Sequence, residues 1–342
     1  MCDIVLYVSG LLTDNYKLSC VIGEDKMNIL VTQTSAFAAS SIIKLINRID
    51  NMDITIHGSD KLSKSMNSAN QMVDKFHKTP STENSDQYIE SINQICLKNN
   101  IDLVIPVMDD EIRIISNHKN DLKFKCIIPE DNIIRLFHDK LEASSAINDI
   151  GVPIPNILYD LRNSSKVIFR NRIGIGSHGI YIVDLKEVQY IENRFTPDIF
   201  IQDFIDGEEY TVDVLADCNG NPVLIIPRKR ITIINGLSYR CKVVQEQSLI
   251  DACYKIYSHF KIPGLSNAQF IIKDGNLYFI ELNTRFAATG IAGIMASYNY
   301  IYDFLNHFVN NEPMKPLEEC MKCVAWNSII TRYYEETISY FE

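Results

Sequence analysis

In the first part of the chain, segments with strand-like apolar runs alternate with segments whose apolar residues have helical spacing. Residues 28–32 and 53–57 are short runs rich in β-formers that predict strands, and residues 36–47 between them carry apolar side chains at helical spacing. Residues 88–98 repeat the helical pattern, and residues 101–106 predict another strand. Strands that alternate with helices predict a doubly wound parallel sheet with helices on both faces, which is the arrangement of an α/β domain.

The pattern changes at Gly151, where a helix predicted up to residue 150 ends in a glycine with prolines just beyond. Short strand patterns separated by turns follow, at residues 167–170, 179–183, 199–204, 210–216 and 223–227. A helical pattern near residues 249–260 precedes two more strands, 268–272 and 277–281, which the pair Asp274-Gly275 is expected to join as a tight hairpin. The second part is therefore expected to be an α+β region.

The length of 342 residues exceeds one ordinary core and favours two or three lobes. Residues 1–26 look unlike the alternating pattern that follows them, and we expect them to be an N-terminal extension outside the core. Met27 directly precedes the first predicted strand, so a start at Met27 is an alternative explanation for this extension.

Composition narrows the class of protein. The chain is 46% hydrophobic and 22% charged, and its net charge of −10 argues against a nucleic-acid partner, because phosphate backbones call for a basic face. The apolar stretch at residues 4–12 lacks a positive flank and is too short to cross a membrane, which predicts a cytoplasmic protein without a membrane partner. Its nine cysteines are then expected to be reduced thiols, and Cys320 and Cys323 lack the second pair that a zinc site usually needs.

A dinucleotide-binding Rossmann domain is the first alternative for the N-terminal pattern. The first strand-to-helix turn, residues 32–38, contains no glycine. The tight turn and the close approach to a pyrophosphate that glycines permit are therefore missing. We expect neither a nicotinamide nor a flavin enzyme.

A glycine-rich loop between two predicted strands is the first candidate for phosphate binding. The glycines of residues 174–179 let backbone N–H groups close over phosphate oxygens; Gly176 is one of them, and the Ser177 hydroxyl adds a donor. Arg170, at the end of the preceding strand, is expected to hold phosphate oxygens through its forked guanidinium. A turn that serves only the hairpin is the open alternative.

Residues 201–212, an apolar strand that runs into a glycine turn, are a candidate for nucleoside binding. Backbone amides around Asp203 and Ile205 are placed to read an adenine edge, and Glu209 to accept hydrogen bonds from ribose hydroxyls. An ordinary hairpin with an acidic turn explains this pattern equally. The basic run Arg228-Lys229-Arg230 comes next, and a triphosphate is one reason for it in an acidic protein, a solvated strand end another.

The strongest chemical pattern lies on the last predicted strand. Glu281 and Asn283 are two positions apart, so their side chains face the same way on a strand. Mg²⁺ prefers hard oxygen ligands and often takes one or two carboxylates, with phosphate and water completing its shell. With Arg285 beside them, these residues form a suitable cradle for a metal–triphosphate, and a buried Glu–Arg ion pair is the open alternative.

The order of these features resembles the ATP-grasp superfamily. FIELNTRF and GLSNAQF look like its metal-binding end, IQDFIDGEEYTVDV like its adenine–ribose hinge, and VIFRNRIGIGSHG like the loop of its lid. Arg170, where many members carry lysine, is similar to the carbamoyl-phosphate-synthase large-subunit-like branch, and DLVIPVMDDE and DKLEASSAINDIGVPIP fit that branch too. The resemblance covers residues 27–300 and rests on the order of the motifs, since each motif alone is weak.

The resemblance implies a fold and a division of the chain. It implies a doubly wound pre-ATP-grasp domain at residues 27–137, a small lid subdomain at 138–203, and an antiparallel-sheet ATP-binding lobe with the C-terminal segment at 204–342. It also implies that ATP binds between the lid and the last lobe. Mg²⁺ is the implied metal, with Mn²⁺ as an alternative.

The resemblance also implies a role for individual residues. Lys140 and Arg170 would contact phosphates, Glu209 the ribose, and Arg285 and Arg230 would act as catalytic cations, Arg285 on the charge that develops at the γ-phosphate. The residues implied to contact the nucleotide are Lys140, Arg170, Gly176, Ser177, Gln202, Asp203, Phe204, Ile205, Glu209 and Gln269, and those implied to bind the metal are Glu281 and Asn283.

Departures from the family pattern leave the substrate open. Asn171 stands where a proline often follows the lid cation, and the loop at 287–290 is poorer in glycine than usual. The leading hypothesis is a ligase that activates a small-molecule carboxylate as an acyl phosphate and couples it to an amine, releasing ADP and phosphate. A phosphotransferase that stops at a phosphorylated product such as a carbamate, and a non-catalytic nucleotide-binding module, are the alternatives. A homodimer is left open.

Overall fold

The computed structural model describes residues 26–158, 166–174, 180–188, 198–333, 336–338 and 340. The expected N-terminal extension, apart from Lys26, lies outside the described residues, and so do Gly176 and Ser177 of the glycine-rich loop. Among the described residues, no helix combines the length and the apolar character that a membrane crossing requires.

The N-terminal part is built on a parallel sheet with strand order β3-β2-β1-β4. Its strands are β1 (Met27–Val31), β2 (Ile54–Asp60), β3 (Lys75–Lys78) and β4 (Leu103–Ile105). Its α-helices are α1 (Phe37–Ile46), α2 (Ser85–Asn99) and α3 (Asp109–Asn117), with single 3₁₀ turns at Lys64–Met66, Ser68–Gln71 and Lys119–Asp121.

Strand β1 shows why this sheet is covered on both faces. Ile29 and Val31 belong to the same buried cluster as Ile42 of α1, whereas Leu30 belongs to another cluster with Ile92 of α2. Because successive side chains of a strand point to opposite faces, an apolar run without polar interruptions requires a helical layer on each side. The predicted doubly wound arrangement is confirmed.

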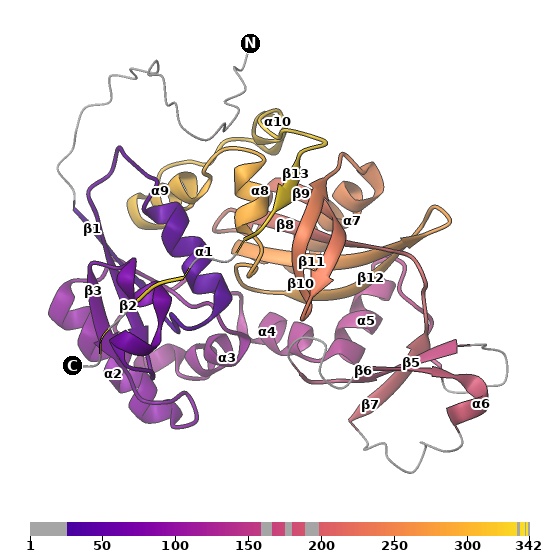
Figure 1. The fold of residues 1–342 in the computed structure, drawn as a ribbon, viewed down its shortest axis with the longest axis horizontal. Coiled ribbons are helices and arrows are strands. Elements are labelled where there is room, and N and C mark those ends of the chain that lie inside the picture. The colour runs from indigo at the N-terminus through magenta and orange to yellow at the C-terminus, as the bar shows by residue number, and fades with distance from the viewer. Residues whose placement is uncertain are drawn as a thin grey trace.

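Two helices lead from this domain to a small antiparallel sheet that projects from the rest of the molecule (Figure 1). The helices are α4 (Asp131–His138) and α5 (Lys140–Asp149). The small sheet contains β5 (Lys166–Asn171), β6 (Ile180–Asp184) and β7 (Ile199–Asp203) in the order β6-β5-β7, and the short helix α6 (Leu185–Val188) follows β6. Its own core is small, with Val167 and Phe169 at the centre.

The C-terminal part is built on a larger antiparallel sheet with strand order β12-β11-β8-β9-β10-β13. Its strands are β8 (Glu208–Ala216), β9 (Pro222–Ile234), β10 (Leu237–Val243), β11 (Gly264–Lys273), β12 (Asn276–Asn283) and β13 (Ile329–Thr331). Its helices are α7 (Gln247–Phe260), α8 (Ile291–Met295), α9 (Ile301–Asn310) and α10 (Leu317–Met321). The predicted hairpin is present, with Asp274 and Gly275 both at positive φ.

The N-terminal and C-terminal parts share one apolar core. Ile43 of α1 lies in the same buried cluster as Leu224 of β9 and Leu305 of α9. The chain also returns at its end: after β13 it runs back toward the N-terminal domain (Figure 1), where the side-chain amide of Gln71 donates to the carbonyl of Ile338 at 2.9 Å. This shared core fixes the relative position of the two parts that form the cavities described below.

Candidate active site

Two cavities meet at the end of β12. The larger, about 660 Å³, lies between the face of the large sheet, helix α1 and the returning C-terminal segment. The smaller, about 50 Å³, lies at the start of α3 and α5 beside Gly174 of the small sheet. Glu281 and Asn283 line both cavities, so they are placed where contents of the two would meet.

A β-bulge sets the direction of these two side chains. Gln269 of β11 pairs with Glu281, but the next residue, Phe270, pairs with Phe279, so Ile280 is the extra residue. Phe279 and Leu282 are buried in the core below the sheet, 1% and 3% exposed. Without the bulge, Glu281 would follow Phe279 into that core, so the extra residue turns Glu281 and Asn283 to the cavities. The expectation that they share a face is confirmed.

The donor set on this strand fits a hard divalent cation. The side-chain amide of Gln269 donates to Glu281 Oε1 at 2.8 Å, and that of Asn283 donates to Asn267 Oδ1 at 3.3 Å, which leaves the amide oxygen of Asn283 as its free ligand atom. One carboxylate and one amide oxygen suit Mg²⁺ when phosphate oxygens and water supply the rest. Within the described ranges, no group of three or more His, Cys, Asp or Glu side chains is arranged to hold a metal ion.

Arg170 of β5 points from the small sheet to the same place. Its guanidinium is 4% exposed, donates to Gln202 Oε1 at 3.2 Å and to the carbonyl of Ile280 at 3.3 Å, and lies 3.9 Å from Glu281 Oε2. Burial lowers the pKa of Arg170, and the Glu281 carboxylate acts against this shift. Arg170 Nε has no partner among the described residues, so the guanidinium retains a donor for an anion. The hydrogen bond to Gln202 Oε1 holds Arg170 in this position.

Lys140, the first residue of α5, reaches the loop of the small sheet. Asp139 caps this helix by accepting from the amide of Leu141 at 3.0 Å. Lys140 Nζ donates to the carbonyl of Gly174 at 2.6 Å and lines the smaller cavity. Burial lowers its pKa, and Glu281 opposes the shift. Lys140 and Arg170 thus bring two cations from different elements to one side of Glu281.

The basic run after the strand pattern divides into three separate roles. Strand β9 does not end at Pro227 but continues to Ile234, because β10 pairs with its second half. Arg228 is fully buried against Asp213, and Lys229 pairs with Glu208 at the other face of the strand. Only Arg230 lines the larger cavity. The interpretation of the run as one cluster for a triphosphate is therefore wrong, because alternation along the strand turns Lys229 to the other face and the charge of Arg228 is buried against Asp213.

Arg230 is held by three groups around it. It donates through Nη1 to Gln269 Oε1 at 3.2 Å, lies 3.2 Å from Glu209 Oε2, and donates through Nη2 to the carbonyl of Gly236 at 2.5 Å. Burial lowers the pKa of Arg230, and Glu209 opposes this. Its Nε has no partner among the described residues. Arg230 and Glu209 thus form an ion pair, and their expected roles toward phosphate and ribose stay predictions.

The hinge strand differs in one detail from the expectation. The backbone amide of Asp203 donates to the carbonyl of Asn156 at 3.0 Å, and that of Phe204 to the carbonyl of Lys166 at 3.3 Å. These two amides are therefore engaged and do not read an adenine edge, which corrects the expectation for Asp203. The amide of Ile205 has no hydrogen-bond partner within the described part of the chain, so it is available as a donor, and its contact with adenine stays a prediction.

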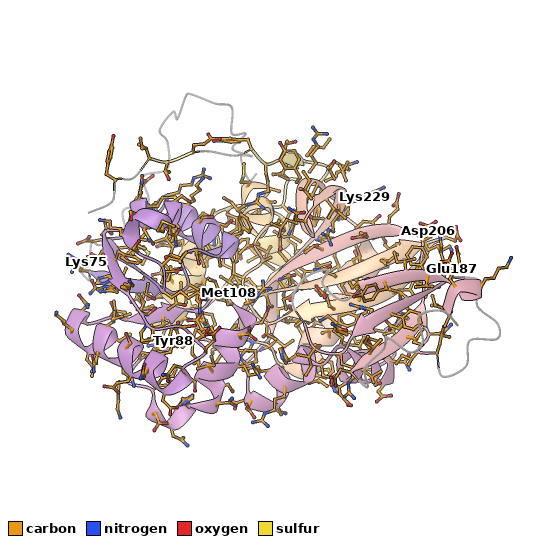
Figure 2. All side chains as sticks on the ribbon, turned by 60° about the horizontal axis from the view of Figure 1, so that its bottom comes forward. Lys75, Tyr88, Met108, Glu187, Asp206 and Lys229 are labelled. Atoms are coloured by element: carbon orange, nitrogen blue, oxygen red, sulfur yellow. The ribbon has the colours of Figure 1, made fainter. Side chains whose placement is uncertain are left out.

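Arg285 makes a contact that the sequence did not indicate. Its Nε and Nη2 both donate to Asp109 Oδ2, at 3.0 and 2.8 Å. Asp109 begins α3, and Figure 2 shows the preceding residue, Met108, between the N-terminal domain and the C-terminal sheets. The only available signal was the acidic turn at the carboxyl end of β4, where parallel sheets commonly place ligand-binding groups.

Comparisons with known proteins place this arrangement in a family. Residues 137–289 match the ATP-grasp domain, and residues 24–128 match the PylC-like N-terminal domain. The chain is 25% identical over 224 residues to the carbamoyl-phosphate synthase of Methanobrevibacter smithii, across 58% of this chain and 60% of that protein. It is 23% identical over 262 residues to the 3-methyl-D-ornithine–L-lysine ligase of Methanosarcina mazei, across 72% of this chain and 67% of that protein.

The fold is also similar to a solved structure. A biotin carboxylase from Campylobacter jejuni superposes with a TM-score of 0.67 at 16% identity, over 90% of this chain and 75% of that one. At this identity the likeness concerns the fold alone. The two domain matches and the two relatives together show that the chain contains an ATP-grasp domain of the carbamoyl-phosphate-synthase-like branch, preceded by a PylC-like N-terminal domain.

Proposed function

We propose that this protein is an ATP-dependent carboxylate–amine ligase. It would activate a small-molecule carboxylate as an acyl phosphate, pass the acyl group to an amine, and release ADP and phosphate. The observation that carries the proposal is the position of Glu281 and Asn283, which line both cavities with Lys140 and Arg170 on one side and Arg230 on the other. The ligase name of the Methanosarcina mazei relative supports the same reaction class.

Each group has a physical role in this proposal. When bound, Mg²⁺ would offset charge on the β- and γ-phosphates, held by the oxygens of Glu281 and Asn283. Lys140 from the start of α5 and Arg170 from the small sheet bind phosphate oxygens, and the Nε of Arg170, which has no partner among the described residues, is available as a further donor. These charges are already in place in a partly buried site, so they stabilise the transferring group without reorganisation.

The residues that line the larger cavity indicate the chemical class of the carboxylic acid substrate. Arg230 and Arg285 are among the cations that line it, together with Lys44 and Arg332. Phe37 and Ile234 also line it and are 60% and 41% exposed, so this cavity offers apolar surface to a ligand. We therefore propose a substrate with a carboxylate at one end and an apolar body.

A phosphate-release screen tests the proposal. The protein is incubated with Mg-ATP and single amino acids, then with pairs of them, and ADP, AMP and phosphate are measured. We expect ADP and phosphate to rise above background with an apolar amino acid, and an amide to form one for one with ADP when the amine is present. A stable phosphorylated product that retains the phosphate would favour the phosphotransferase instead, and AMP with pyrophosphate would contradict both.

Glu209 is expected to act on nucleotide affinity. Glu209→Ala removes the candidate ribose acceptor and should weaken Mg-ADP binding by about 1–3 kcal/mol, measured by titration calorimetry. Glu208→Ala is the matched control, because this neighbouring carboxylate pairs with Lys229 on the opposite face of the sheet. Equal effects of the two substitutions, or no effect of Glu209→Ala, would show that the ribose lies elsewhere.

A further inference from the structure

Asp109 of the N-terminal domain and Arg285 of the C-terminal part form an ion pair inside the candidate site. They are 176 residues apart in sequence, and a single carboxylate oxygen, Asp109 Oδ2, accepts from two nitrogens of the guanidinium. Both side chains are largely buried, 20% exposed for Asp109 and 15% for Arg285. Asp109 lines the smaller cavity and Arg285 the larger, so the pair forms part of the wall between them.

The carboxylate stands on a rigid support. Asp109 is the first residue of α3, and residues 106–108 connect it to the end of β4 at the carboxyl edge of the parallel sheet. Two residues along the same turn, Glu111 is fully buried and accepts a hydrogen bond from the hydroxyl of Tyr88 in α2. Figure 2 shows Tyr88 within the N-terminal domain, and Tyr88 lines neither cavity. The turn that carries Asp109 is therefore anchored in the core of that domain.

Arg285 has no comparable support on its own side. It lies in the loop after β12, where its backbone carbonyl accepts from the side-chain amide of Asn267 at 3.4 Å, and among the described residues the other hydrogen bond of its guanidinium is a long one, from Nη1 to the carbonyl of Phe286 at 3.4 Å. An arginine side chain in such a loop samples many rotamers unless a partner fixes it, and freezing it at the moment of reaction opposes catalysis. The bond to Asp109 removes this freedom in advance.

We propose that Asp109 is a positioning residue for the transfer step. It holds Nε and Nη2 of Arg285, so that the guanidinium is already directed to the place where the γ-phosphoryl group meets the carboxylate. This inference rests on the proposed ligase function. It gives the N-terminal domain a part in the chemistry, because Arg285 is correctly placed only when that domain is docked against the ATP-grasp lobe.

Nucleotide binding tests this without knowledge of the acid or the amine. The probes are Mg-ADP and the non-hydrolysable analogue Mg-AMP-PNP, whose affinity ratio isolates the contribution of the γ-phosphoryl group. Asp109→Asn keeps the size of the side chain and removes its charge. We expect it to weaken AMP-PNP binding by about tenfold, the scale of one charge-assisted hydrogen bond, and to leave ADP binding within about twofold.

Further variants separate positioning from simple structural support. Arg285→Ala should reduce the affinity for AMP-PNP relative to ADP at least as much as Asp109→Asn does. The double variant should bind both nucleotides as Arg285→Ala does, because Asp109 acts through Arg285. Asp109→Glu should restore part of the ratio. Asp110→Asn is the matched control: it removes a charge from the same helical turn, where Asp110 pairs with Arg113 at the surface, and should leave both affinities unchanged.

Two results would overturn the inference. One is an unchanged affinity ratio in a folded Asp109→Asn protein. The other is an additional loss from Asp109→Asn when Arg285 is already alanine. Failure of the proposed function looks different, since it appears in the phosphate-release screen as the absence of an amide product and leaves the comparison of the two nucleotide affinities unaffected.

Discussion

Glu281→Gln and Asn283→Ala should each lower metal-dependent ATP turnover by about 100-fold to 1,000-fold, the scale at which removal of one preorganised electrostatic group acts on a transition state. The change at Glu281 replaces a charged oxygen ligand by an amide of the same shape, so the fold should be retained. Both residues line the two cavities, and their direction depends on the bulge at Ile280. Steady-state phosphate release, with substrates found by the screen, measures the loss.

Binding of Mn²⁺ gives the same test without a substrate. Paramagnetic relaxation of water protons should report tight Mn-ATP binding to the unmodified protein and much weaker binding to both variants. Asn276→Ala is the matched control for Asn283→Ala, because Asn276 begins the same strand but is exposed and lines neither cavity. Normal metal binding and turnover in both site variants would contradict the assignment of β12 as the metal-binding strand.

Asp213→Ala is expected to have the largest effect on stability. Asp213 accepts from Nε and Nη2 of the fully buried Arg228, at 2.6 and 2.8 Å, and Arg228 also donates to Thr289 Oγ1 at 3.2 Å. Removal of the carboxylate leaves a buried guanidinium without its counter-charge, so the free energy of unfolding should fall by about 3–5 kcal/mol. Urea denaturation followed by circular dichroism measures the change.

Two companion variants check this explanation. Asp213→Leu combined with Arg228→Met removes both charges and should recover much of the lost stability, because the penalty comes from the unpaired charge. Lys229→Ala breaks only the exposed pair with Glu208 and should change the free energy of unfolding by less than about 1 kcal/mol. If Asp213→Ala cost no more than Lys229→Ala, the buried pair would not be a main support of the large sheet.

The sequence predicted those parts of the fold that local pattern determines. The β1–α1–β2 alternation and the hairpin of β11 and β12 follow from spacing and turn residues within a few positions, and all are present. It also identified Glu281 and Asn283 as neighbours on one face. Their direction toward a cavity depends on pairing with Gln269, and the sequence alone does not reveal the bulge that produces it.

Long-range pairing explains what the sequence did not predict. The sequence suggests a surface cation at Arg228, whereas the pairing of β8 with β9 places Asp213 at a diagonal position where the two side chains form a buried ion pair. The sequence did not indicate that Asp109 contacts Arg285, because this contact depends on how the N-terminal domain docks on the C-terminal sheet. The proposed lobes at 27–137, 138–203 and 204–342 and the nucleotide roles of the site residues stay predictions, and Gly176 and Ser177 lie outside the described residues.

The path of one oxygen atom tests the central claim most directly. If the γ-phosphoryl group is transferred to the carboxylate and the amine then attacks the carbonyl carbon, the C–O bond breaks and one carboxylate oxygen leaves with the phosphate. With an acid substrate labelled with oxygen-18 in its carboxylate, mass spectrometry should find one labelled oxygen in each phosphate released and none in AMP. Unlabelled phosphate formed in step with the amide would contradict the acyl-phosphate route.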